Sequence, residues 1–194
     1  MTAKPLVLAL VLVAGAAKGQ SVTPATRTEG RGEKAPDFTL VTQDDRVFTL
    51  SKDGRGRPLL LTFVYTSCPG ACPYVVEECL QAARAAGKGR PAEDRPFVVA
   101  VSFDPGVDTP KHLRAHMKEN GLKASEIAFL TGGRTAVDLV LHDWQVNVGR
   151  DENGALFHGF QTAVIDREGT IVARYYGAGI DMKRLVADAR AAAR

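Results

Sequence analysis

Apolar residues fall into short continuous runs that alternate with segments of helical spacing. The runs 58–65 (PLLLTFVY) and 97–103 (FVVAVSF) are rich in β-branched and aromatic residues, as is typical of strands buried on both faces of a sheet. Between them, residues 73–86 place apolar side chains on one helical face and charged ones on the other, and Pro73 suits a first helical turn. The pattern predicts a strand–helix–strand unit.

Further elements are expected on both sides of this unit. Strands are predicted at 38–40, 47–50, 127–130, 160–165 and 171–176, helices at 109–120, 134–144 and 181–193, and a hairpin over 145–157 that turns at Asn153-Gly154. Asp108 or Thr109 is expected to cap the 109–120 helix. The fold class is therefore α/β: a central mixed sheet flanked by helices, with an extra β-hairpin before His158.

The amino-terminal segment has a different pattern. Lys4 precedes an apolar run, residues 5–17, that is shorter than the about 20 residues that a membrane-spanning helix needs. The run ends in the small residues Ala14-Gly15-Ala16, as signal-peptide cleavage sites do. We interpret residues 1–17 as a signal peptide, or else as an N-terminal anchor. Both interpretations place the protein outside the cytoplasm, in the periplasm or at the outer face of the cell membrane, and an anchor would keep it near that membrane.

Two further segments complete the predicted organisation. Residues 18–33 lack apolar periodicity and carry Gly, Thr, Ser and charged residues, so a flexible linker is expected there. Residues 34–194 are expected to form one folded domain. The export signal matters for the chemistry, because thiol pairs can oxidise outside the cytoplasm.

Composition narrows the function classes. The 194 residues are 45% hydrophobic and 24% charged, as in a globular domain of ordinary size. The 25 basic and 22 acidic residues give a net charge of +3, which gives no reason to expect nucleic acid as a partner. Three cysteines are too few for a disulfide scaffold, so each is considered by its own position.

Cys68 and Cys72 lie where the buried strand gives way to the helix. Ligands of open α/β sheets gather at the carboxyl ends of strands, and the helix N-terminus is expected to favour thiolate over thiol. One helical turn, roughly 6 Å of rise, separates the two residues. The pair can therefore switch between dithiol, disulfide and metal-bound forms. Cys79 lies about 10 Å further along the helix, on its apolar face, and is expected in the core.

The four histidines differ in their surroundings. His112 and His116 have the i, i+4 spacing of some zinc sites, but the lysines and arginine around them favour a solvated helix face. His142 is expected to pack near a helix end or to interact with its dipole. His158 lies between the predicted hairpin turn and the next strand, with phenylalanines close by, and is a candidate functional residue.

Three segments in order, YTSCPGACP (65–73), VSFDPGVDTP (101–110) and HGFQTAVIDREG (158–169), resemble the Sco/SenC family. The resemblance covers about residues 34–194 and implies a thioredoxin-like fold. It also implies one copper ion, Cu(I) or Cu(II), bound by Cys68, Cys72 and His158, in a chaperone that serves the binuclear copper centre of cytochrome c oxidase. The implied partners are the copper-centre subunit of the oxidase, a copper donor protein and a thioredoxin-like reductant.

Other residues of these segments leave alternatives open. Asp104 and Asp108 are expected to support the metal site or a partner surface, and the alternative for Asp108 is a simple role in a turn and a helix cap. Cys79 is extra to the family signature, and Gly159 stands where a small hydroxyl residue is frequent. Neither departure changes a proposed ligand.

The chemistry of the three side chains agrees with copper. Thiolates are soft ligands that suit Cu(I), and imidazole also accommodates Cu(II). Oxidation of the pair Cys68 and Cys72 would remove both sulfur ligands at once. The alternative function is an extracytoplasmic thiol–disulfide oxidoreductase that uses this redox-active pair as its catalytic residues. Thioredoxin-type enzymes use C-x-x-C and a late cis-proline loop, whereas this chain has C-x-x-x-C and its last proline is Pro110, which favours the metal.

Overall fold

The structure is a computed structural model that describes residues 24–68, 72–150, 152 and 156–194. The predicted signal peptide, residues 1–17, lies outside these residues. In chain order the elements are β1 (Thr26–Glu29), β2 (Thr39–Thr42), β3 (Val47–Thr49), α1 (Leu50–Asp53), β4 (Leu59–Val64), α2 (Cys72–Gly87), a 3-10 turn (Ala92–Asp94), β5 (Phe97–Ser102), α3 (Pro110–Glu119), β6 (Ile127–Thr131), α4 (Arg134–Asp143), β7 (Val148–Arg150), β8 (Leu156–His158), β9 (Gln161–Ile165), β10 (Ile171–Tyr176) and α5 (Met182–Ala192).

The central sheet is mixed and has eight strands in the order β1-β10-β9-β4-β5-β6-β2-β3. The three middle strands β4, β5 and β6 run parallel, and the outer strands pair antiparallel. Every residue of β4 is buried, because helices cover both faces of the sheet at its centre. This confirms the predicted α/β class with a mixed central sheet.

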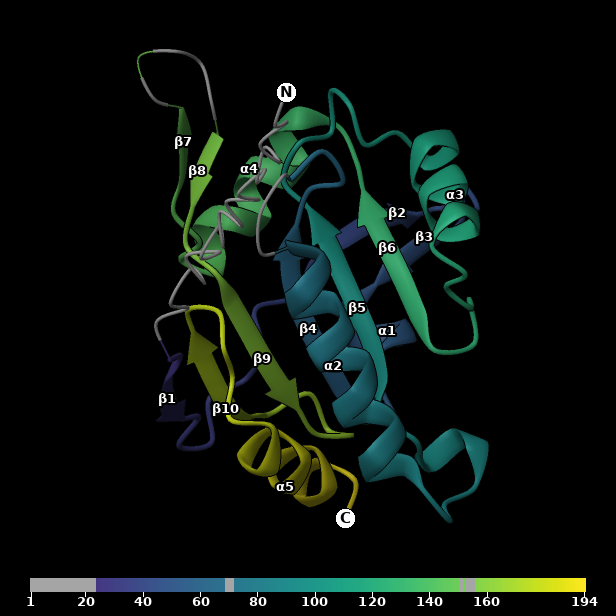
Figure 1. Ribbon diagram of the computed structural model, residues 1–194, viewed down its shortest axis with the longest axis vertical. Coiled ribbons are helices and arrows are strands. Elements are labelled where there is room, and N and C mark those ends of the chain that lie inside the picture. Colours follow the sequence, from purple (N-terminus) through teal and green to yellow (C-terminus); the bar gives the residue numbers. More distant parts are fainter. Residues whose placement is uncertain (1–23, 69–71, 151, 153–155) are drawn as a thin grey trace, which may run out of the picture.

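Side chains that alternate along the strands form two separate cores. Leu60, Val98 and Phe129 face the side covered by α2, α3 and α5, whereas Leu61 and Val99 face the side covered by α4. Figure 1 shows α2 crossing over β4 and β5, with α5 beside β9 and β10. The predicted amphipathic spacing of the helices thus serves a three-layer arrangement. Within the described part of the chain, no helix has the length and apolar character to cross a membrane.

The linker prediction fails for residues 26–29. They form β1, an edge strand that pairs antiparallel with β10, and its Arg27 contacts Asp188 of α5 with an Nε to Oδ2 distance of 2.6 Å. Three of the four β1 residues are exposed. An edge strand exposed in this way leaves no apolar periodicity in the sequence, which is why the segment resembled a linker.

The predicted hairpin before the distal histidine is present. β7 and β8 pair antiparallel as a two-stranded sheet of their own, and they extend beyond one end of the central sheet (Figure 1). His158 is the last residue of β8, opposite Val148, rather than part of the connection that follows the hairpin. The predicted turn at Asn153-Gly154 lies outside the described residues.

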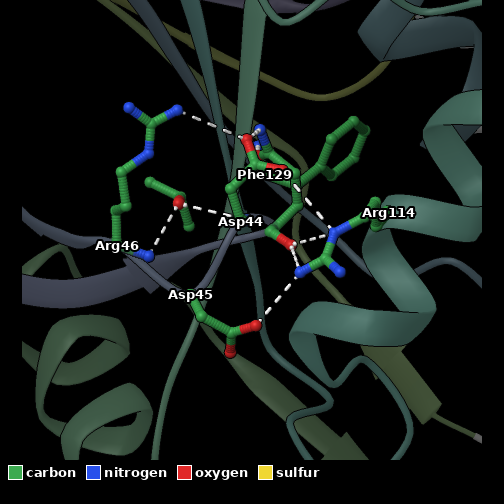
Figure 2. A network of polar contacts seen from close by, with 7 residues as sticks. Asp44, Asp45, Arg46, Arg114 and Phe129 are labelled. Atoms are coloured by element: carbon green, nitrogen blue, oxygen red, sulfur yellow. Dashed lines mark hydrogen bonds and ion pairs between the residues drawn. The ribbon is translucent and has the colours of Figure 1, made fainter.

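Helix α3 is fastened to the turn between β2 and β3. The Arg114 guanidinium donates to the backbone carbonyl of Gln43 from Nε at 3.1 Å and from Nη2 at 2.9 Å. Its Nη2 also donates to Asp45 at 3.0 Å. Figure 2 shows this arginine reaching from the helix into the turn. The contact fixes the helix that follows the loop of Asp108.

Candidate metal centre

The two cysteines lie at the carboxyl end of β4, in the middle of the sheet. β4 ends at Val64, and the chain then turns, with the Cys68 amide donating to the Tyr65 carbonyl at 3.3 Å. Helix α2 begins at Cys72. Cys72 is buried, with 3% of its surface exposed, and Cys68 is partly exposed. The buried strand thus presents one accessible and one buried sulfur at the edge where α/β sheets bind ligands.

His158 reaches the same place from the end of β8, the strand before β9. β9 begins three positions after it and pairs with β4 through Thr162 and Thr62. Strand adjacency therefore places the end of β8 beside the end of β4. One ligand atom each from Cys68, Cys72 and His158 lies within 4.8 Å of the others, and the Cys72 Sγ is 3.7 Å from His158 Nε2.

These separations fit a single metal ion. Taking metal–sulfur and metal–nitrogen bonds of about 2.3 and 2.0 Å, ligand angles between tetrahedral and trigonal put the sulfur and nitrogen roughly 3.5–3.8 Å apart. The observed 3.7 Å falls in that range. Among the described residues, these three form the group of Cys, His, Asp and Glu side chains that could hold a metal ion. Two soft sulfurs with one imidazole suit copper.

Aromatic rings hold the imidazole of His158 in place. The ring centroids of Phe103 and Phe160 are 4.6 and 4.5 Å from it, and Tyr65 lies edge-on at 5.6 Å. His158 Nδ1 faces the Gly159 carbonyl at 3.4 Å, so Nδ1 carries the hydrogen and Nε2 offers its lone pair toward Cys72. Burial lowers the pKa of His158, an effect only partly opposed by the Gly159 carbonyl. The neutral, metal-binding form is therefore favoured.

The thiol of Cys72 does not behave as its helix position predicts. Burial raises the pKa of Cys72, and the nearby Cys68 and Asp108 raise it further. Desolvation thus outweighs the helix N-terminus, which was expected to favour thiolate. Burial and Cys68 likewise raise the pKa of Tyr65 to about 12. A metal that binds here must displace a thiol proton, so binding strengthens as pH rises.

The remaining cysteine and histidines are not among the three residues of this centre. Cys79 is fully buried, 3.9 Å from the Thr162 hydroxyl, which confirms the core prediction, and burial raises its pKa to about 12. His112 is exposed, as predicted, whereas His116 is half-buried and packs edge-on to Phe129 at 5.6 Å. His142 is exposed and contacts Asp143 at 3.1 Å.

Residues beside the centre include several that the sequence did not single out. Thr66 and Ser102 both hydrogen-bond to the buried carboxylate of Asp108. Thr109, not Asp108, caps α3, because its side chain accepts from the His112 amide. In the sequence, Thr66 and Ser102 stand out only as polar residues next to or within apolar segments, which does not indicate a common partner. A cavity of about 150 Å³ adjoins Cys72 and is lined in part by His116 and Phe129.

The comparisons with known proteins agree with this site. The model of the SCO1/SenC family matches residues 26–194. This chain belongs to the SCO1/SenC family. A SCO2-like protein of Rickettsia felis is 28% identical over 146 residues, which covers 72% of this chain and 68% of the relative. Protein SCO1 homolog 2 of Arabidopsis thaliana, a mitochondrial protein, is 32% identical over 110 residues, covering 56% of this chain and 37% of the relative.

Solved structures of the family share the fold. Bradyrhizobium japonicum ScoI, solved with copper bound, superposes with a TM-score of 0.65 at 25% identity, covering 82% of this chain and 97% of that one. A SCO1/SenC family lipoprotein from Bacillus anthracis superposes with a TM-score of 0.71 at 24% identity, covering 83% of this chain and 95% of that one. The predicted thioredoxin-like Sco fold is therefore confirmed.

Proposed function

We propose that this SCO1/SenC protein binds one copper ion per chain through Cys68, Cys72 and His158 and delivers it to the binuclear copper site of cytochrome c oxidase. The observation that carries the proposal is the convergence of two sulfurs and one imidazole nitrogen within 4.8 Å. Cys68 and Cys72 come from the junction of β4 and α2, and His158 comes from the separate β7-β8 ribbon. The copper-bound structure of a family member supports the choice of metal.

The site is suited to handing over its ion. Three protein ligands leave a coordination position for a ligand of the recipient. Cys68 is partly exposed while Cys72 is buried, so the recipient approaches from the Cys68 side. Transfer as Cu(I) exchanges one set of ligands for another and needs no electron donor. The protons displaced from the thiols on loading return to them on release.

The proposal also covers the cellular location of the protein and its partners. The apolar run at residues 5–17 would direct export, and the domain would work at the outer side of the cell membrane. The recipient is the copper-centre subunit of the oxidase. A copper donor and a thioredoxin-like reductant would supply the ion and keep Cys68 and Cys72 reduced.

The first experiment measures copper binding by the full chain, reduced and kept under anaerobic conditions. Cu(I) is supplied in a chelator competition, and bound metal is counted after removal of excess ion. One copper per chain is expected. Cys68→Ser and Cys72→Ser should lower the Cu(I) affinity at least a hundredfold, and His158→Ala should weaken Cu(II) binding more than Cu(I) binding.

Matched controls separate ligand loss from general damage. Cys79→Ala removes a thiol from the core, and His142→Ala removes an exposed imidazole. Both should keep one copper per chain. Full Cu(II) affinity in His158→Ala would refute the role assigned to His158.

A second experiment tests delivery against disulfide exchange. The copper-loaded protein is mixed with a soluble copper-centre domain of the oxidase whose thiols are reduced, and the copper held by each protein is measured after the two are separated. Transfer of copper to the recipient is expected. If the copper-free, reduced protein reduces an oxidised recipient but never transfers copper, the oxidoreductase alternative replaces the proposal.

A further inference from the structure

The loop between β5 and α3 carries a carboxylate with no part in the helix cap. Thr109 caps α3, so the buried Asp108, with 0% of its surface exposed, is left for another purpose. Its backbone amide donates to the Asp104 carbonyl at 2.9 Å, and its carboxylate lies against Thr66, two positions after the end of β4. Burial of a carboxylate is costly unless hydrogen bonds replace its water.

Those hydrogen bonds come from two segments. Asp108 Oδ2 accepts from the Ser102 hydroxyl at 2.6 Å and from the Thr66 backbone amide at 3.1 Å. Asp108 Oδ1 accepts a short hydrogen bond from the Thr66 hydroxyl. Thr66 is thus held by both its backbone and its side chain. If Thr66 moved away, a buried charge would lose two of its donors, so the loop position and the carboxylate are coupled.

His112 completes the network from the solvent side. Its Nε2 is 3.0 Å from the Thr66 hydroxyl and 4.0 Å from Asp108 Oδ1. The Thr66 hydroxyl has one hydrogen, and it is donated to the carboxylate, which can only accept. His112 Nε2 must therefore donate to Thr66. The chain of donors runs from the exposed imidazole through Thr66 to the buried carboxylate.

The same segment leads directly into the metal centre. Thr66 lies between Tyr65, whose ring packs edge-on against His158 at 5.6 Å, and the turn that carries Cys68. We propose that Asp108 is a positioning residue of the metal centre, acting through Thr66 to hold Cys68 facing Cys72 and His158. This inference rests on the proposed function, and it adds the residue that fixes the ligand geometry.

Preorganisation predicts two measurable effects. Copper leaves more slowly when its ligands are held in the binding geometry. A ligand that detaches from the ion then stays in place and binds it again before the ion is lost. The disulfide also forms more readily between sulfurs already held together. In that reaction the two thiols of Cys68 and Cys72 lose two protons and two electrons and form one S–S bond, while glutathione disulfide takes up both and becomes two glutathione molecules. This second effect is measurable without copper.

The experiment compares Asp108→Asn, Thr66→Val and Thr66→Ser with the wild-type full chain. Release of Cu(I) to excess chelator is expected to be at least tenfold faster in Asp108→Asn and Thr66→Val. The equilibrium constant for oxidation by glutathione disulfide is expected to fall about tenfold, which corresponds to about 30 mV in midpoint potential. Thr66→Ser keeps the hydroxyl and should restore both values to within threefold of wild type.

A remote, exposed carboxylate provides a control with the same kinds of donor. Asp37 accepts from the Ser51 amide and hydroxyl at 2.8 and 2.6 Å, with the same donor types as Asp108 but away from the cysteines. Asp37→Asn and Ser51→Ala should leave copper release and the glutathione equilibrium unchanged, even where they lower the unfolding midpoint.

The possible outcomes distinguish a positioning role of Asp108 from a purely structural one, and they distinguish failure of this inference from failure of the proposed function. Wild-type release rates and wild-type equilibria in both Asp108→Asn and Thr66→Val would overturn the inference and leave Asp108 a structural residue. If Asp108→Asn does not fold, the comparison of Thr66→Val with Thr66→Ser decides alone. Failure of the wild-type protein to bind copper would overturn the proposed function only, and the glutathione equilibrium would still decide on Asp108.

Discussion

Burial sets the protonation of individual side chains in this protein. His158 and His116 are each about half-buried, and burial is the largest cause that lowers the pKa of both. The same desolvation raises the pKa of Cys72. Bases are thus kept neutral and the thiol is kept protonated, because in each case the charged form loses its water. Without a metal ion, the imidazole of His158 and the thiol of Cys72 are therefore both expected to be uncharged.

Neutral buried histidines make the copper-free protein sensitive to acid. His116 has its ordinary pKa near 6.5 when unfolded and a lower pKa when folded, so the unfolded chain takes up the proton first. Stability should therefore fall as pH drops through 6.5 and level off below the folded pKa. Urea unfolding at pH 7.5 and 5.5 measures this loss. His116→Gln should reduce the loss, and an undiminished loss in that variant would contradict the assignment.

Two contacts between elements hold the frame around the centre. Arg114 ties α3 to the turn between β2 and β3, and Figure 2 shows how the turn wraps its guanidinium with a carbonyl and carboxylates. At the other end, Arg27 of β1 and the Tyr175 hydroxyl of β10 both contact Asp188 of α5. The first contact is half-exposed and the second is mostly buried. Removing them should therefore lower the free energy of unfolding by different amounts.

Loss of the half-exposed contact should be mild. Arg114→Met is expected to lower the free energy of unfolding by about 1 kcal/mol, because hydrogen bonds from a charged group to a carbonyl are lost at a partly solvated site. Arg46→Met is the control, since Arg46 is 80% exposed and lies 3.7 Å from Asp44; it should cost less than about 0.5 kcal/mol. Equal losses in the two variants, measured by urea unfolding, would show that the carbonyl contact adds nothing.

Loss of the buried contact should be severe. Asp188→Asn leaves the guanidinium of Arg27, only 18% exposed, without its carboxylate, and should lower the free energy of unfolding by roughly 3 kcal/mol. Asp138→Asn breaks an exposed i, i+4 pair with Arg134 and should cost at most about 0.5 kcal/mol. Chemical unfolding of both variants makes the comparison, and a cost for Asp188→Asn as small as that of Asp138→Asn would argue against the buried pair.

The folded unit as a whole begins earlier than the sequence pattern predicts. The linker was expected to extend to residue 33, but β1 and its Arg27 belong to the sheet. A chain that begins at residue 24 should therefore unfold with the same midpoint as the full chain. A chain that begins at residue 34 should have a free energy of unfolding lower by roughly 3 kcal/mol or more, because it lacks both β1 and Arg27, the partner of Asp188. Identical thermal midpoints for the two shortened chains would restore the linker interpretation.

The success of sequence reasoning depended on the physical origin of each feature. β4 and α2 were predictable, because continuous burial and amphipathic spacing leave periodic patterns. Cys68 and Cys72 stood out by their spacing at a strand end. The proposed role of His158 came from resemblance, since no local pattern connects a histidine on a hairpin with cysteines that follow β4.

Other features left no trace that the sequence could show. The hydrogen bond between Thr66 and Asp108 joins two loops far apart in the chain. Threonine and aspartate are common in loops, so neither residue type identifies its partner. The raised pKa of Cys72 was missed because burial, which outweighs the helix terminus, is a property of the packed molecule. β1 was missed because its side chains are mostly exposed.

The pairing of β7 with β8 alone has a consequence for how the ion departs. Among the described strands, β7 and β8 pair only with each other, and a two-stranded ribbon has less backbone pairing to hold it than a strand inside a larger sheet. The nitrogen of His158 belongs to that ribbon, whereas Cys68 and Cys72 follow β4, in the middle of the central sheet. On the proposed function, opening of this ribbon would withdraw the imidazole and leave the ion on two sulfurs, where a ligand of the recipient can take it.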